Sequence, residues 1–526
     1  MKMVNKLVIV LGLCLLGLNL VNLAAVPKRL RINEEEEMHP VFAQKTMRSS
    51  MRLNPEEAEQ DYWLEASKKH ILEKLSYVRN TNKAKNIILF LGDGMGLATL
   101  AAARNLLGGE EMKLSFEEFP YTGLSKTYSV DKIVPDSACT STSYLCGVKA
   151  NYGTIGVNAH VKRGDCLAMA NETNHVYSLG KWAMDKGKAA GLVTTTRVTH
   201  ASPSGVYAHT ADREWENNAV LEEACPGELG ENLNDIAVQL IHGEVGSKLK
   251  VMLGGGKRSF YAPEFYDKGR RTDGRNLVEE FEALDEGNVF VKTQKKLLNV
   301  NATETGRLLG LFSKSHLHYH LEQLADEENN EPTLEEMTQK AIEVLQTEEQ
   351  GYFLFVEGGK IDISHHDTMA RIALDETVEL SKAVKLARAM TSVEDTLIVV
   401  TSDHSHTFSL SGYQPRHSDI FSEAESKGTD GKPYLPLSYA NGLSFDSFYN
   451  TEGHQRYDPL AQRTGEFDEI FPAMAPLLSE THGGEDVGVF ASGPWAHLFT
   501  GVYEQNSIPH MMAYAACVGD GQTACD

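Results

Sequence analysis

Six short runs of apolar residues recur along the chain, separated by segments with helical periodicity. The runs cover residues 86–91, 189–194, 251–253, 352–356, 396–401 and 487–490. Continuous apolar runs of this length are typical of strands that are buried on both faces, and their alternation with helices favours a mostly parallel sheet. We therefore expect an α/β fold with a mostly parallel central sheet flanked by helices on both faces.

Composition excludes one large class of partner. The chain has 526 residues and 41% hydrophobic content, which is enough for a large core in one or two domains. Its formal charge of -23 and pI near 5.3 should repel a phosphate backbone. We expect no nucleic-acid partner, and instead small molecules, cations or a second copy of the chain.

The first 25 residues have the pattern of a secretory signal peptide. Lys2 and Lys6 precede an apolar run over residues 7–23, and two alanines follow it. The run is short for a membrane span and asparagines interrupt it, so we expect cleavage rather than a signal anchor. The mature chain is then predicted to be secreted and extracellular.

Cysteine usage agrees with secretion. Removing Cys14 with the signal peptide leaves an even and sparse set, which is typical of a few disulfides formed in an oxidising compartment. Asn171 and Asn301 lie in glycosylation sequons, Asn-Glu-Thr and Asn-Ala-Thr. The six remaining cysteines are Cys139, Cys146, Cys166, Cys225, Cys517 and Cys525.

Domain organisation is predicted from shifts in composition. Residues 26–50 mix a basic cluster with an acidic run and show no periodicity, which predicts a flexible arm or propeptide. The α/β core is expected over residues 51–411, beginning with a helix near Pro55 that could pack on the core or on a second subunit. Residues 412–478 are rich in Gly, Pro, Ser, Tyr and Asp, and we interpret them as an inserted, crown-like, loop-rich subdomain. Residues 479–526 complete the core.

The turn after the first expected strand carries an acid between glycines. Residues 92–96 read Gly-Asp-Gly-Met-Gly, and the glycines let the backbone turn sharply so that the Asp93 carboxylate projects. Because open α/β sheets bind ligands beyond the carboxyl ends of their strands, Asp93 is a candidate metal ligand. A dinucleotide-binding loop is the competing interpretation, but its third glycine comes one residue early and an acid occupies the turn.

Two later strands lead into further clusters of acids and histidines. One leads into Glu357, Asp362 and His366, and the next leads into Asp403 and His404. Asp362 and His366 are spaced i, i+4, so one helical turn places both on the same face. Adjacent Asp403 and His404 would point apart in a strand, so both can bind one ion only where the chain has left the pleat. Such clusters are typical of a polynuclear metal site.

Ser137 is the candidate nucleophile. It precedes a helical pattern, so we expect it at a helix N-terminus, where backbone N–H groups favour anions. From the residue alone, an ordinary N-cap is an equal interpretation. Downstream segments add His200, Ser202 and Arg213, and an arginine beside a metal cluster suits bidentate phosphate binding. His482 precedes another strand and is a weaker metal candidate by itself.

Taken together, these segments resemble the animal alkaline phosphatases, from the helix near Pro55 through Cys525. Several of the matching segments would be specific alone. They are NIILFLGDGMG (86–96), VPDSA (134–138), YLCGVKAN (144–151), VEGG (356–359), SDHSH (402–406) and ETHGGED (480–486).

The resemblance implies a site with two zinc ions and one magnesium ion. One zinc would be held by Asp362, His366 and His482. The second would be held by Asp93, Asp403, His404 and, during reaction, the Ser137 oxygen. The magnesium would be held by Asp93, Ser202 and Glu357. This division agrees with ligand chemistry, because imidazole suits zinc while carboxylate and hydroxyl oxygens suit magnesium.

The implied reaction is hydrolysis of phosphate monoesters to an alcohol and inorganic phosphate. An in-line displacement would transfer the phosphoryl group to Ser137, and water would then hydrolyse the phosphoserine. Arg213 resembles the residue that binds the substrate phosphate. His200 resembles a residue that lies near the magnesium without binding it.

The family resemblance also implies a homodimer and two disulfides. Cys146 would be free as in relatives, and Cys139 would be an additional thiol near the nucleophile. The chain ends without the spacer and apolar tail of a lipid-anchor signal, so we expect no lipid anchor in this form. The implied disulfides are Cys166–Cys225 and Cys517–Cys525.

Some positions depart from the family pattern. Ile363 stands where many vertebrate relatives carry histidine, and Ser141 replaces the usual glycine or alanine, so local metal tuning is expected to differ. The resemblance does not extend fully to the calcium (Ca2+) site of the family. Glu264 and Glu331 could contribute oxygens there, but Ser313 stands where relatives place a carboxylate.

Two rival functions compete with this interpretation. A hydrolase of sulfate esters or phosphodiesters would share the metal-bearing sheet. However, the sulfatase nucleophile motif needs proline and arginine two and four residues after the nucleophile, where this chain has Cys139 and Ser141. A non-catalytic binding protein with the same fold would lack ligands, and none of the expected ligands is missing.

Overall fold

The computed structural model describes residues 54–227, 232–450 and 455–526. The predicted signal peptide (1–25) and arm (26–50) lie outside these residues. In the described part of the chain, none of the helices is both long and apolar enough to cross a membrane.

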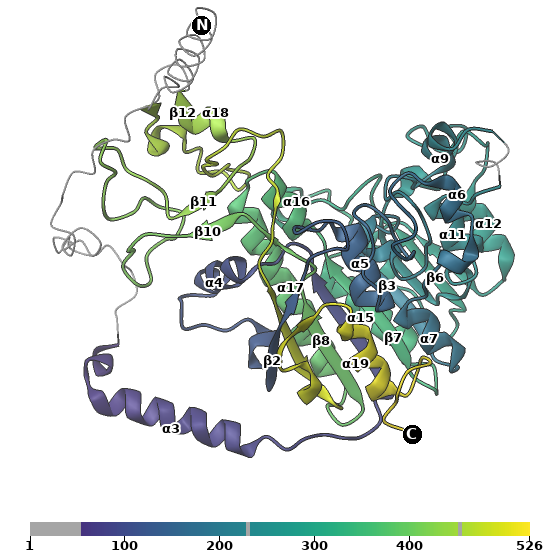
Figure 1. The fold of residues 1–526 in the computed structure, drawn as a ribbon, viewed down its shortest axis with the longest axis horizontal. Coiled ribbons are helices and arrows are strands. Elements are labelled where there is room, and N and C mark those ends of the chain that lie inside the picture. Colours follow the sequence, from purple (N-terminus) through teal and green to yellow (C-terminus); the bar gives the residue numbers. More distant parts are fainter. Residues whose placement is uncertain (1–53, 228–231, 451–454) are drawn as a thin grey trace, which may run out of the picture. The chain divides into compact units, whose positions relative to one another are not determined.

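A ten-stranded sheet forms the centre of the fold, in the order β16-β2-β15-β8-β1-β7-β3-β4-β6-β5 (Figure 1). Hydrogen-bonded neighbours are parallel except at β15, which is antiparallel to both β2 and β8. The strands are β1 (Asn86–Gly92), β2 (Tyr121–Lys126), β3 (Ala189–Arg197), β4 (Val251–Gly255), β5 (Asn288–Val291), β6 (Arg307–Leu311), β7 (Tyr352–Gly358), β8 (Thr396–Thr401), β15 (Val487–Ser492) and β16 (Gly501–Glu504).

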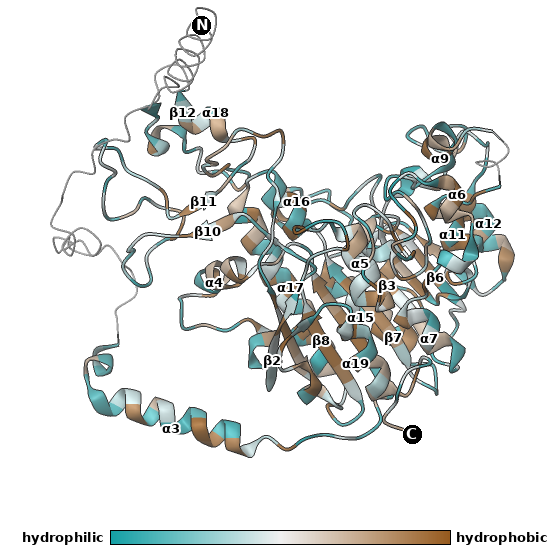
Figure 2. Cartoon of the chain, viewed as in Figure 1, coloured by the Kyte–Doolittle hydropathy of each residue, from teal (hydrophilic) through white to brown (hydrophobic). Residues whose placement is uncertain are grey.

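Helices cover both faces of this sheet, so the predicted fold class is confirmed. Side chains of β1 alternate between the two faces: Ile87 and Leu89 belong to one apolar cluster, whereas Ile88 and Phe90 belong to the other. Strands in the centre of Figure 2 are accordingly coloured as hydrophobic. The first cluster includes side chains of α5 (Ser137–Cys146), α7 (Leu179–Asp185), α11 (Ile236–His242) and α19 (Ser507–Ala516). The second includes side chains of α4 (Leu97–Leu106), α15 (Leu334–Leu345) and α17 (Ala370–Met390).

All six predicted strands are present in the ten-stranded sheet, and the prediction missed the other four strands of that sheet: β2, β5, β6 and β16. Two of these, β16 and β5, are the edge strands of the sheet. An edge strand is not enclosed on all sides, so its sequence need not carry the long continuous apolar run that marks a central strand. In β16, for example, the first two residues are exposed.

The predicted N-terminal helix is present as η1 (Pro55–Ala58) followed by α3 (Gln60–Ser76). It buries none of its residues: the exposed fractions of Trp63 and Leu64 are 52% and 59%. The predicted packing of this helix on the core of its own chain is therefore not observed. Packing on a second subunit stays a prediction.

Residues 412–450 and 455–478 contain short elements joined by loops. Interpretation of residues 412–478 as an inserted crown-like subdomain stays a prediction. The elements in and beside this segment are β10 (Phe408–Leu410), β11 (Leu437–Tyr439), α18 (Phe445–Phe448), β12 (Tyr449–Asn450), β13 (Gln455–Arg456) and η6 (Pro459–Gln462).

Strand direction determines which chain segments meet beyond the sheet. The carboxyl ends of β1, β3, β7 and β8 lie at the same edge because these strands are parallel. Strand β15 runs in the opposite direction, so its beginning lies at that edge too. Just before it, β14 (His482–Gly483) pairs with β9 (Ser405–His406). His482, more than seventy residues after β8 in the sequence, is thereby brought to the residues that follow β8.

Candidate active site

The turn after β1 joins two of the predicted acidic residues. Gly94 follows Asp93 with φ of 71°, and a Cβ there would lie 2.5 Å from His406 Nε2, so only glycine fits. Its N–H donates a hydrogen bond to Asp403 Oδ1 at 3.0 Å. The backbone of the glycine-rich turn thereby fixes the position of a carboxylate that follows β8.

Ser137 is the first residue of α5, and Asp136 is its N-cap. The ordinary N-cap interpretation of Ser137 is therefore wrong. Its Oγ lies 3.1 Å from His404 Nε2 and 3.4 Å from Asp93 Oδ1. His404 Nε2 is also 3.0 Å from Asp403 Oδ2, so the serine hydroxyl faces a group of two carboxylates and one imidazole.

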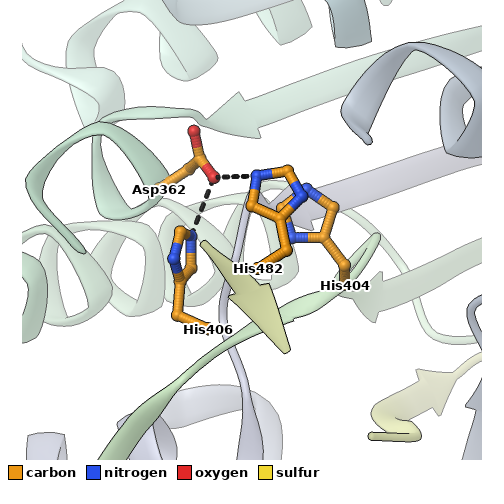
Figure 3. A group of neighbouring side chains, drawn as sticks. All are labelled: Asp362, His404, His406 and His482. Atoms are coloured by element: carbon orange, nitrogen blue, oxygen red, sulfur yellow. Dashed lines mark hydrogen bonds and ion pairs between the residues drawn. The ribbon is translucent and has the colours of Figure 1, made fainter. Parts of the chain in front are cut away.

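A second group surrounds Asp362. Asp362 and His366 lie on α16 (Lys360–His366), which begins two residues after β7. The Oδ1 atom of Asp362 lies 3.4 Å from His366 Nε2, 3.3 Å from His482 Nε2 and 2.8 Å from His406 Nε2. Figure 3 shows this carboxylate between the rings of His406 and His482, with His404 stacked on His482 at 3.5 Å between ring centroids.

The tautomers of two imidazoles in this group are fixed by backbone carbonyls. His366 Nδ1 donates to Glu480 O at 2.6 Å, and His482 Nδ1 donates to Pro135 O at 2.8 Å. Burial lowers the pKa of both rings, which favours their neutral form. Each Nε2 then carries a lone pair, yet the two Nε2 atoms lie only 3.1 Å apart. Two lone pairs and the Asp362 carboxylate converge, which is the donor set of a zinc-type cation site.

The third group consists of oxygen donors. Ser202 Oγ lies 3.2 Å from Asp93 Oδ2. Thr194 and Thr196 donate to Oε2 of Glu357, while its buried Oε1 has no hydrogen-bond partner among the described residues. Burial raises the pKa of Glu357 to about 7. An orphaned buried carboxylate oxygen beside a hydroxyl and a second carboxylate fits a hard cation such as Mg2+.

Negative charge accumulates at this edge of the sheet. Asp93, Glu357 and Asp403 are completely buried, and Asp362 is 4% exposed. Burial, followed by the charges of its acidic neighbours, raises the pKa of Asp93 well above its usual range. Several buried carboxylates without matching positive charge are unfavourable, and bound cations would compensate them. The residues present therefore fit a polynuclear metal centre.

Arg213 binds the residue that precedes the serine, and its side chain is 18% exposed. Its Nη1 donates to Asp136 Oδ2 at 3.0 Å, and its Nη2 donates to His200 Nε2 at 3.2 Å. Burial opposes the charge of Arg213, but Asp136 outweighs this and raises its pKa. Asp136 also accepts a hydrogen bond from Cys139 N at 3.3 Å, so one carboxylate orients both the arginine and the helix that begins with Ser137.

Sequence reasoning missed His406 and Asp136 as contributors to the site. Buried His406 lies between two carboxylates, donating from Nδ1 to Glu480 and from Nε2 to Asp362. Burial opposes its charge, but Glu480 and then Asp362 raise the pKa of His406 to about 10. The protonated ring then orients Asp362. The available signal was its position two residues after His404 in the SDHSH segment.

The remaining predicted residues have definite places. Disulfides link Cys166 to Cys225 and Cys517 to Cys525, and Cys139 and Cys146 are buried free thiols. Both sequon asparagines, Asn171 and Asn301, are exposed.

The residues suggested for calcium do not form a cluster. Glu331 accepts from the His318 N–H at 2.8 Å and pairs with its ring at 3.1 Å. Glu264 is exposed. Over the described ranges, neither glutamate belongs to a group of three or more acidic or histidine side chains close enough to share an ion.

An α/β sheet with a serine, an arginine and a polynuclear cation site at its carboxyl edge defines a metal-dependent hydrolase. Residues 84–518 match the family model described as alkaline phosphatase. The chain belongs to the alkaline phosphatase family, and its activity is that of an alkaline phosphatase.

Similar proteins extend over nearly the whole chain. The membrane-bound alkaline phosphatase of Bombyx mori is 43% identical over 94% of this chain and 92% of its own length. The human tissue-nonspecific alkaline phosphatase is 42% identical over 90% of this chain and 92% of its own. Among solved structures, Thermus thermophilus alkaline phosphatase has a TM-score of 0.60 at 24% identity, covering 84% of this chain and 93% of that one.

Proposed function

We propose that this alkaline phosphatase hydrolyses phosphate monoesters through a phosphorylated Ser137, at a site for two zinc ions and one magnesium ion. The observation that carries this proposal is the position of Ser137 Oγ, at the start of α5 and within 3.4 Å of both Asp93 Oδ1 and His404 Nε2. A cation held by the two carboxylates and the imidazole beside it would stabilise the serine alkoxide and so favour loss of the hydroxyl proton to solvent, and the N–H groups at the start of α5 favour a phosphate.

The three donor groups support the assignment of the metals. Each member offers a ligand atom of the type that the assigned ion prefers, and Asp93 contributes to two sites. When bound, the cations supply the charge that lowers the pKa of the serine hydroxyl and of water, and that neutralises the phosphoryl oxygens. We assign Asp362, His366 and His482 to one zinc, Asp93, Asp403 and His404 to the other, and Asp93, Ser202 and Glu357 to magnesium.

The protein side chains perform the remaining steps. Arg213 binds two phosphoryl oxygens with its planar guanidinium, which Asp136 and His200 hold from the other side. Ser137 Oγ attacks phosphorus in line with the departing alcohol oxygen, and a phosphoserine forms. Water then attacks that phosphorus from the vacated side, which restores the serine and releases phosphate.

We also propose that the protein is a homodimer and that it is secreted. A helix of 17 residues that buries none of its side chains supports a homodimer in which a second subunit covers α3. The signal-like segment at residues 1–25 supports secretion. Sedimentation analysis and N-terminal sequencing of protein recovered from culture medium test these two points.

One experiment tests the central proposal. Phosphate release from an aryl phosphate monoester is measured across pH, with and without a chelator, and acid-quenched enzyme is analysed by mass spectrometry. Activity that the chelator removes, together with phosphate on Ser137, supports the proposal. Stable phosphate on a different residue would overturn it.

A further inference from the structure

The residue assigned to phosphate binding lies between two acids in the sequence, Asp212-Arg213-Glu214. Glu214 has a 62% exposed side chain, and its Oε1 lies 3.9 Å from Arg213 Nε. Asp212 is the more enclosed of the two, with an 18% exposed side chain. A free carboxylate next to Arg213 would repel a phosphate dianion, and the net charge of -23 adds to that repulsion.

Asp212 is not free, because Arg163 occupies both of its oxygens. Arg163 Nε donates to Oδ2 at 2.9 Å and its Nη2 donates to Oδ1 at 3.1 Å. This bidentate arrangement is the strongest geometry for an arginine and a carboxylate. Oδ1 also accepts from the Glu214 N–H at 3.0 Å, which fixes the direction of the Asp212 side chain.

The local fold holds Arg163 in this place from two sides. The Gly164 N–H donates to Ala211 O at 3.0 Å, so the backbone beside Arg163 is joined to the segment that carries Arg213. The stem of Arg163 covers Gly153, which has φ of 80°, and a Cβ on this glycine would lie 2.5 Å from Arg163 Cδ. Gly153 in turn accepts from the Arg213 N–H at 2.9 Å.

The same loop also reaches the nucleophile helix. The N–H of Gly153 donates to Asp136 Oδ1 at 2.9 Å, and Asp136 binds Arg213 and caps α5. Three residues after Arg163, Cys166 is tied to Cys225 by a disulfide. The Arg163–Asp212 pair therefore belongs to the hydrogen-bonded network around Arg213 and is not an isolated ion pair at the surface.

We infer that Arg163 is a positioning residue for phosphate binding: it neutralises Asp212 and holds that carboxylate in a bidentate pair, so that of the two acids that flank Arg213 only the exposed Glu214 stays unneutralised when the substrate dianion arrives. The inference rests on the proposed role of Arg213. Because exposed ion pairs contribute little to the stability of a protein, we expect this pair to act mainly on the electrostatic potential at the phosphate-binding arginine. Its loss should weaken phosphate binding and leave the chemical step nearly unchanged.

Four variants of the full-length, metal-loaded enzyme test the inference. They are Arg163→Ala, Asp212→Asn, the double variant, and Arg275→Ala as a matched control. Arg275 forms a similarly exposed bidentate pair with Glu280, at 2.9 and 2.6 Å. The measured quantities are kcat, KM for an aryl phosphate, and the inhibition constant of inorganic phosphate, at low and at high salt.

Arg163→Ala should raise KM and the phosphate inhibition constant roughly three- to tenfold at low salt, with kcat changed less than about twofold. Asp212→Asn should lower both constants. The double variant should return to within about twofold of wild type, and high salt should shrink all three differences. The Arg275→Ala control should match wild type.

Other outcomes overturn the inference. If Arg163→Ala raised KM but Asp212→Asn did not restore it, Arg163 would support the loop sterically rather than through charge. An effect that is independent of salt would have the same meaning. Failure of Arg163→Ala to fold leaves Asp212→Asn as the deciding variant, since unchanged phosphate affinity there contradicts the inference. Failure of the proposed function itself would give a different result, because the wild-type enzyme would then release no phosphate from the monoester.

Discussion

The Nε2 atoms of His366 and His482 face each other at 3.1 Å, although neither nitrogen can donate a hydrogen bond to the other. Both rings carry their proton on Nδ1, where Glu480 O and Pro135 O accept it. Two adjacent lone pairs repel each other unless a cation lies between them and the nearby Asp362 carboxylate. The backbone contacts of the two rings thus preorganise this pair of nitrogens for binding a metal ion.

Metal removal should inactivate the enzyme and lower its melting temperature, because the buried carboxylates lose their compensating charge. Zinc with magnesium should restore both properties. His482→Ala should mainly empty one zinc site, whereas Asp93→Ala should lower the content of two kinds of site. Elemental analysis of the purified variants measures this difference, and equal metal content in both would contradict the assignment.

Ser137→Ala should abolish most turnover while metal content stays close to that of wild type, because the change removes the covalent route but few structural contacts. Ser141→Ala is the matched control, since Ser141 lies in the same helix and its Oγ donates to Ala138 O. Steady-state rates and zinc content are the measurements. Full activity in the Ser137 variant would refute its role as nucleophile.

Arg213→Ala should reduce monoester hydrolysis more than diester hydrolysis. A diester offers one fewer charged oxygen to the guanidinium, so it loses less when the arginine is removed. A charge-assisted hydrogen bond contributes roughly 1.5–3 kcal/mol, which corresponds to about a tenfold to hundredfold loss in kcat/KM for the monoester. Phosphate inhibition should weaken in parallel. Equal losses for both substrate classes, with unchanged phosphate inhibition, would mark Arg213 as structural.

Glu376→Gln should stabilise the protein at pH 8 and have little effect at pH 5. Glu376 lies on α17, is 4% exposed and accepts from the His320 N–H at 2.7 Å, and burial raises its pKa to about 7. The folded state therefore retains this proton to higher pH than the unfolded state, so the contribution of Glu376 to stability falls as pH rises from about 4.5 to about 7. Removing the charge should recover up to about 3 kcal/mol above that range.

Unfolding midpoints of wild type and the Glu376 variant at the two pH values measure this effect. Glutamine retains an oxygen that can accept from His320, so the comparison isolates the charge. A difference between the two proteins that is the same at pH 5 and pH 8 would show that Glu376 ionisation does not affect stability.

Central strands were predictable from sequence because enclosure on both faces demands a continuous apolar run, as in β1, β7 and β8. The edge strand β16 escapes this demand, and its first two residues are exposed. Strands β5 and β6 do carry short apolar runs, at residues 289–291 and 308–309, which the prediction passed over. Asp362 and His366 were predictable as a pair because helix periodicity alone places them on one face. His482 was the weakest candidate because its approach to the site depends on the reversed direction of β15, a property of the whole sheet.

Contacts between side chains that are distant in sequence were the part that could not be predicted. Asp136 caps a helix, as its sequence position allows, but its bond to Arg213 becomes visible only when the two segments are folded together. The same holds for His406 between Asp362 and Glu480, and for Arg163 on Asp212. In each case the local sequence permits many partners, and the tertiary fold selects one.

His482 lies late in the sequence but joins residues that follow β8, and this has a consequence for synthesis of the protein. A nascent chain can assemble β1, β7 and β8 and expose Asp93, Asp362 and Asp403 well before the ribosome reaches His482. Until then the imidazole of His366 has no counterpart, so firm binding of the zinc ion that we propose for this pair would have to wait for the final tenth of translation. Chains that terminate or stall before His482 should therefore have no phosphatase activity. Activity then appears only when synthesis of nearly the whole catalytic domain has finished.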